Sequence, residues 1–78
     1  MKNIGPVSLG WLQEIGVLTI EDLRRIGSVP IYIELRKLHT KISLNLLWAL
    51  EGAILDIDCR ELSQERKKEL REMVQVNS

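Results

Sequence analysis

Apolar residues recur along this chain at spacings of three and four, and strict alternation of apolar and polar positions is nearly absent. This periodicity is typical of amphipathic helices and not of strands. Glycines and short polar turns separate the apolar stretches from one another. The pattern predicts an all-α fold, a compact bundle of about five short helices over residues 6–15, 19–27, 28–38, 43–55 and 63–76.

Residues that favour helix ends support these boundaries. Pro6 suits a first helical turn because its missing N–H would be unpaired there. Gly16 stands where a left-handed C-cap is expected. Thr19 and Asp22 have the spacing of a capping box. Three serines are expected to be the N-caps of the later helices: Ser28, Ser43 and Ser63.

The fourth helix is apolar on most of its circumference, which is typical of a helix at the centre of a fold. Trp48 lies in this helix and is expected in the core, whereas Trp11 could be core or an exposed contact. Gly52 costs about 1 kcal/mol relative to alanine inside a helix. We expect the small residues Ala49, Gly52 and Ala53 to let another helix pack closely here.

Length and composition limit the fold to one small domain over residues 1–78. The single cysteine excludes an intrachain disulfide, so the core depends on aliphatic packing, with oligomerisation as a further source of stability. The 11 basic and 11 acidic residues give zero net charge, which argues against strong non-specific binding to nucleic acid. No apolar run is long enough to span a bilayer or to act as a signal peptide, so we expect a cytoplasmic protein.

The first two helices form a hairpin with a glycine turn, and Gly5-Pro6 precedes them. This order resembles the second half of a helix-hairpin-helix unit, whose exposed backbone N–H groups can bind phosphate. A basic residue beside the turn is expected in such units, but here the neighbours are Val7 and Ser8. A scaffold role is favoured over DNA binding. The residues that could contact nucleic acid are Lys2, Gly5, Val7, Ser8, Arg24 and Arg25.

Candidate catalytic and metal-binding groups are few. Asp56 and Asp58, with Glu51 and Glu61 nearby, could hold a magnesium ion, but solvated carboxylates are the favoured interpretation. A Cys–His nucleophilic pair needs an orienting partner and a pocket. Nothing in the sequence brings His39 and Cys59 together; we expect His39 in an exposed turn and Cys59 partly buried. We therefore predict no enzymatic activity, no catalytic residues, no cofactor, no metal and no small-molecule substrate.

Three segments together resemble the C-terminal domain of the TfoX/Sxy competence regulators: IGPVSLGWLQEIGVLTIEDLRRIGSV, SLNLLWALEGAI and RELSQERKKEL. The resemblance extends from about Lys2 to Leu70. It implies an all-α domain with a helix-hairpin-helix or SAM-like arrangement. It also implies a role in controlling natural competence together with other transcription factors. Full-length regulators of this family usually carry an N-terminal α/β domain, so a stand-alone C-terminal domain is expected here.

Two functional hypotheses follow. The first is a regulatory protein-interaction module that binds a protein partner or forms a homodimer, with weak or no direct DNA binding and no membrane contact. Neutral charge, small size and the very apolar fourth helix favour it. The second is direct DNA binding through the Gly5–Ser8 turn, with help from the basic residues named above. An apolar patch of a few hundred square ångströms would support the first hypothesis, and a contiguous basic surface would support the second.

Overall fold

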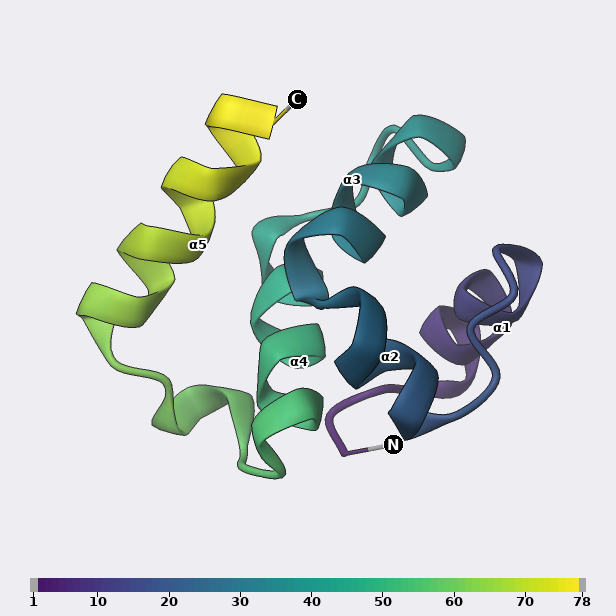
Figure 1. Ribbon diagram of the computed structural model, residues 1–78, viewed down its shortest axis with the longest axis horizontal. Helices are drawn as coiled ribbons and strands as arrows, with labels where there is room; N and C mark the ends of the chain where they lie inside the picture. The colour runs from purple at the N-terminus through teal and green to yellow at the C-terminus, as the bar shows by residue number, and fades with distance from the viewer. Residues whose placement is uncertain (1, 78) are drawn as a thin grey trace.

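Residues 2–77, which the computed structural model describes, contain five α-helices, one 3-10 helix and no strand (Figure 1). The predicted all-α fold is confirmed. The helices are α1 (Pro6–Glu14), α2 (Ile20–Ile26), α3 (Ser28–Leu38), α4 (Leu44–Leu55) and α5 (Gln64–Asn77), with η1 (Cys59–Glu61) between the last two.

The prediction that the fourth helix is central is confirmed. In Figure 1, α1 and α5 lie on opposite flanks of α2, α3 and α4. Most of α4 is buried, including Leu47 and Leu50, which have no exposed surface. The core continues into other helices through Leu12, Leu23, Leu35 and Leu70. Within the described residues, no helix has the length and apolar character needed to cross a membrane.

The predicted caps of α2 and α5 are confirmed. The Asp22 N–H donates to Thr19 Oγ1 (3.2 Å), and the Thr19 N–H donates to Asp22 Oδ2 (3.2 Å), which completes the capping box. The Leu18 N–H also donates to Asp22 Oδ2, and this hydrogen bond is the main reason that the pKa of Asp22 is lowered. The Arg66 N–H donates to Ser63 Oγ at the start of α5.

The predicted Ser28 cap is wrong. Gly27 is the N-cap of α3, with a φ of +98° that an L side chain rarely adopts. Ser28 is the first residue of α3, is buried, and donates its hydroxyl to Glu51 Oε1 (2.8 Å). Its side chain therefore links α3 to α4. Ser43 is the N-cap of α4 as predicted, but its side chain makes no capping hydrogen bond.

The close approach at Gly52 is confirmed, but the neighbours are the N-terminal segment, the α4–η1 connector and the first residue of η1, and not another α-helix. A Cβ on Gly52 would lie 2.5 Å from Asn3 Nδ2, 3.0 Å from the Ile57 carbonyl oxygen and 3.2 Å from Cys59 Cα. Asn3 donates from Nδ2 to the Ile57 carbonyl and accepts at Oδ1 from the Cys59 N–H. The glycine thus makes room for a clasp between the N-terminal segment and the α4–η1 connector.

Two apolar side chains are more exposed than the periodicity predicts. Trp48 is only partly buried against the core, and Lys67 Nζ of α5 lies 5.8 Å from its ring centroid. A lysine packs its stem on apolar surface and keeps its charged end in water, so this face of α4 lies at the edge of the core. The periodicity places Ile26 on the inner face of α2, but this side chain is 38% exposed, because it lies at the rim where α2 meets α3.

Candidate functional site

The predicted nucleic-acid turn lies at the start of α1. Gly5 is its N-cap and no side chain caps the helix. Gly5 and Val7 are exposed, whereas Ser8 is half-buried in a shallow hollow that it shares with Trp11 and Lys41. The turn therefore presents backbone N–H groups, but it does so among small and apolar side chains.

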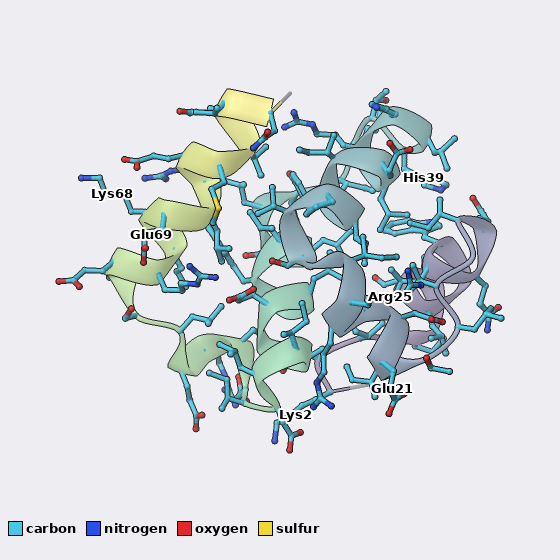
Figure 2. All side chains as sticks on the ribbon, in the orientation of Figure 1. Lys2, Glu21, Arg25, His39, Lys68 and Glu69 are labelled. Atoms are coloured by element: carbon cyan, nitrogen blue, oxygen red, sulfur yellow. The ribbon has the colours of Figure 1, made fainter. Side chains whose placement is uncertain are left out.

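The basic residues predicted to assist the turn are divided between two places. Lys2 and Arg24 line one hollow of about 560 Å³, whose wall also contains Asp56. Arg25 lies on α2 (Figure 2), and its side chain is 72% exposed and pairs with Asp22, with Nη2 3.4 Å from Oδ1. The structure brings together two of the three basic residues, Lys2 and Arg24, beside the acidic Asp56. DNA contact by Lys2, Gly5, Val7, Ser8, Arg24 and Arg25 stays a prediction.

The Asp58 carboxylate of the α4–η1 connector binds protein groups. Asp58 accepts hydrogen bonds from the Arg60 side chain at 3.1 Å (Nε to Oδ1) and 2.9 Å (Nη2 to Oδ2) and from the Arg60 backbone N–H. These contacts lower the pKa of Asp58 from 3.8 to about 2, the side-chain hydrogen bonds contributing most. Within residues 2–77, no group of three or more histidine, cysteine or acidic residues could hold a metal ion.

His39 and Cys59 take part in separate contacts. The His39 ring stacks on Trp11 with centroids 4.7 Å apart, and its Nε2 lies 3.2 Å from Glu14 Oε2. His39 is therefore half-buried and joins α3 to α1, so the expectation of an exposed turn residue is wrong. Cys59 is partly buried as predicted, beside the Asn3 clasp. His39 and Cys59 therefore do not form a nucleophile–base pair with each other.

The buried carboxylate of Glu51 links three helices, and the sequence pattern did not predict this link. Glu51 of α4 is 5% exposed. It accepts from Ser28 of α3 at Oε1 and from Arg66 of α5 at Oε2, with Nε and Nη2 of the arginine both 2.9 Å away. One signal could have revealed it: Glu51 is the one charged residue in a helix that is otherwise apolar on most sides. A carboxylate there needs a partner from another element.

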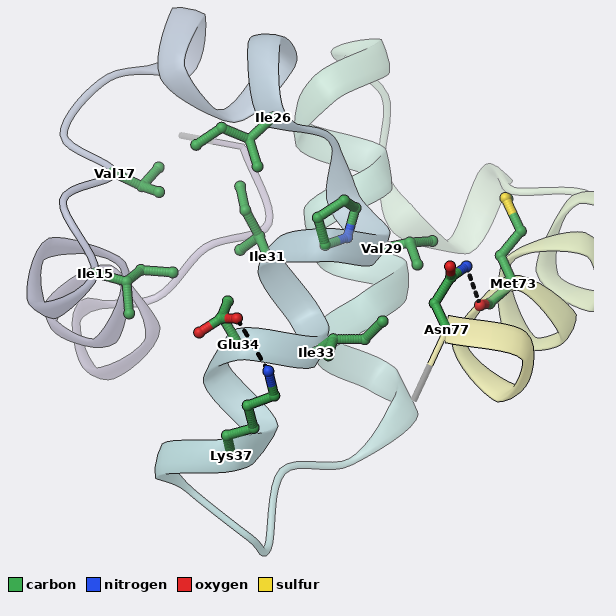
Figure 3. A pocket seen from close by; sticks show the side chains of 11 residues that line it. Ile15, Val17, Ile26, Val29, Ile31, Ile33, Glu34, Lys37, Met73 and Asn77 are labelled. Carbon is green, nitrogen blue, oxygen red and sulfur yellow. Dashed lines mark hydrogen bonds and ion pairs between the residues drawn. The ribbon is translucent and has the colours of Figure 1, made fainter.

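A large apolar hollow lies between α3, the α1–α2 loop and the end of α5 (Figure 3). Its volume is about 720 Å³, and Val29, Ile31 and Ile33 of α3 contribute to its wall. The Glu34–Lys37 ion pair (3.2 Å) lies at one side, and the hydrogen bond from Asn77 Nδ2 to the Met73 carbonyl lies at the other. The hollow is therefore an apolar groove that has an ion pair at one end and an uncharged hydrogen bond at the other.

Two smaller hollows continue this groove around α5. Met73 lines all three, but in the hollow at the end of α5 Met73 and Val76 lie among charged and polar side chains: Arg66, Glu69, Glu72 and Asn77. Seven large apolar side chains are exposed in the described residues, and four of them line these hollows. We call these four residues and Pro30 the α5 surface: Ile26, Pro30, Leu55, Met73 and Val76.

Comparison with known proteins agrees with this fold. The sequence model of the TfoX C-terminal domain matches residues 1–74. The chain belongs to the TfoX C-terminal domain family. The resemblance seen in the sequence is thereby confirmed, and this TfoX C-terminal domain fills nearly the whole 78-residue chain.

Two crystal structures resemble this TfoX C-terminal domain closely. Both are from Listeria monocytogenes: an uncharacterized protein in a triclinic form, with a TM-score of 0.89, and a protein of unknown function in a tetragonal form, with a TM-score of 0.87. Each is 29% identical over 97% of this chain, which covers 86% of the first protein and 93% of the second. The search of curated proteins gives no match.

Proposed function

We propose that this TfoX C-terminal domain is a non-catalytic, cytoplasmic module that binds protein within a regulatory assembly, as the competence role of TfoX/Sxy regulators implies. The observation that carries the proposal is the α5 surface. It gathers four of the seven exposed large apolar side chains of the described residues around one helix. Exposed apolar side chains gathered in one place are typical of protein-binding sites.

The composition of the α5 surface supports a protein as its ligand. Protein interfaces combine an apolar centre, in which methionine is enriched, with a polar rim. Met73 is at the centre here, and its flexible thioether adapts to a partner's shape. The rim carries side chains of both charges and one amide: Glu34, Lys37 and Asn77 in the first hollow, and Arg24, Arg66, Glu69 and Glu72 in the other two. A phosphate backbone would need a basic rim instead.

Direct DNA binding through the Gly5–Ser8 turn is the second candidate. The uncapped start of α1 and the hollow shared by Lys2 and Arg24 favour it. The acidic side chain of Asp56 in that hollow and the zero net charge of the chain oppose it.

Site-specific photocrosslinking in the native host would separate these candidates. A photoreactive phenylalanine analogue replaces Met73 in one variant and the 67% exposed Val7 in another. The exposed Glu21 of α2 serves as the control position. We expect protein adducts of discrete mass at Met73 and none at Val7 or Glu21. Nucleic-acid adducts at Val7 without protein adducts at Met73 would instead support DNA binding.

A further inference from the structure

Two charged side chains of opposite sign that form no ion pair in the described residues lie beside the α5 surface. Arg24 lines one of its hollows together with Met73, and Glu72 lines the next hollow together with Met73. Arg24 donates from Nε to the Ile54 carbonyl, but neither Arg24 nor Glu72 forms an ion pair within residues 2–77. An apolar centre is thus flanked by a cation on one side and an anion on the other.

This arrangement is self-complementary. In a two-fold symmetric interface, each contact between two different residues across the axis occurs a second time with the residues exchanged. If Met73 lies near the axis, Arg24 of each copy faces Glu72 of the other, and the apolar side chains of both copies cover one another. A surface with a cation on one side of its centre and an anion on the other can therefore pair with the same surface of a second, identical chain.

We propose that a second copy of this chain occupies the α5 surface in a symmetric dimer, with Met73 near the two-fold axis and two Arg24–Glu72 ion pairs at the edges. The proposal rests on the proposed function, since it names the partner of the same surface. The partner is identified by this charge pattern and by the apolar centre.

Size and charge agree with a dimer. A stable interface covers roughly 800 Å² on each partner, and this domain has an accessible surface of 4894 Å². Zero net charge means that two copies do not repel one another over distance. Small domains without disulfides or metals often depend on oligomerisation for stability. A dimer would also remove Ile26, Leu55 and Val76 from water.

Sedimentation equilibrium of the purified chain over a wide concentration range tests the proposal. We expect the wild type to be dimeric, and Met73→Asp to weaken dimerisation by at least about tenfold, because it places a charge at the apolar centre. Val7→Asp is the matched control, since Val7 is also exposed but lies on α1. It should leave the dissociation constant unchanged.

A charge exchange tests the contact itself. Arg24→Glu and Glu72→Arg should each weaken the dimer by roughly tenfold, because each change occurs twice in a symmetric interface. The double variant Arg24→Glu/Glu72→Arg should restore most of the affinity. Both residues are exposed, so folding of these variants is expected and is checked by circular dichroism.

A wild-type chain that stays monomeric throughout would overturn the proposal. So would a dimer that is insensitive to Met73→Asp or one that the double variant fails to restore. A monomeric chain that still gives protein adducts at Met73 in the photocrosslinking experiment would disprove self-association and leave the proposed function standing. A chain that dimerises in solution but gives no protein adducts at Met73 in the host would also overturn the proposal. It would mean that two copies associate through this surface only at high concentration.

Discussion

Buried Glu51 and half-buried Arg66 form an ion pair that joins α4 to α5, with Arg66 Nη2 2.9 Å from Glu51 Oε2. Ser28 of α3 completes the arrangement through the other carboxylate oxygen. Only Leu70 and Val74 of α5 are buried, so this ion pair has a large share in positioning the helix. Because α5 carries Met73, the pair also sets the shape of the proposed interaction surface.

Arg66→Ala should destabilise the fold by roughly 2–3 kcal/mol, because it leaves the Glu51 carboxylate buried without its cation. The figure is below that for a fully buried pair, since the Arg66 side chain is 38% exposed. Urea unfolding followed by circular dichroism measures the change. Lys68→Ala is the control, since Lys68 points away from the bundle on α5 (Figure 2) and should shift stability by less than about 0.5 kcal/mol. Equal stability of the two variants would contradict the role given to the pair.

Gly52→Ala should destabilise the fold by about 1–3 kcal/mol, although alanine is the better helix former. The added methyl group would lie 2.5 Å from Asn3 Nδ2 and disturb the clasp. Gly10→Ala is the matched control, since Gly10 lies inside α1 and a Cβ added there would meet no atom within 4 Å. It should stabilise the protein by up to about 1 kcal/mol. Thermal unfolding measures the stability of both variants relative to the wild type. Stabilisation by both substitutions would disprove the close approach at Gly52.

Stability should depend on Asp58 in acid. Its pKa is lowered from 3.8 to about 2 in the fold by Arg60, so the ionised carboxylate favours the folded state above 3.8. This contribution is lost as the pH falls from 3.8 towards about 2. Asp58→Asn and Arg60→Gln should therefore both be less stable than the wild type near neutral pH, and the differences should shrink across that range. Urea unfolding at several pH values measures them; differences that stay constant would contradict the pairing.

Leu50→Ala should cost more stability than Trp48→Ala. Leu50 has no exposed surface, and truncation of a buried leucine costs about 2–5 kcal/mol. Trp48 is partly exposed beside Lys67, so its truncation should cost roughly 2 kcal/mol, less than the 3–5 kcal/mol typical of a fully buried tryptophan. Chemical denaturation of the two variants gives the order. A larger loss for Trp48→Ala would place that ring in the core after all.

Local signals made much of the fold predictable from the sequence. Thr19 and Asp22 are three residues apart, and their capping box depends on nothing outside that turn. The apolar circumference of α4 likewise identified the central helix. The Ser28–Glu51 hydrogen bond joins residues 23 apart, and the Glu51–Arg66 pair joins residues 15 apart. Such contacts depend on how helices cross, which periodicity does not define.

The candidate site was less predictable for the same reason. Met73 belongs to the apolar stripe of the last helix, but the stripe alone does not show that 36% of its surface stays exposed. Ile26 and Leu55 come from other helices and meet Met73 only in the folded chain. The basic residues near the N-terminal turn are visible in the sequence, whereas the position of Asp56 beside Lys2 and Arg24 becomes apparent only in three dimensions.

Amide NMR of the isotopically labelled chain would compare the α5 surface with the N-terminal turn most directly. Spectra are recorded at rising protein concentration and then with random duplex DNA at low and physiological salt. We predict concentration-dependent shifts at Ile26, Met73 and Val76, and no DNA-dependent shifts at Ile4–Ser8. Shifts at Ile4–Ser8 that weaken with salt, together with an α5 surface that does not respond to concentration, would contradict the account and identify the turn as a phosphate-binding site.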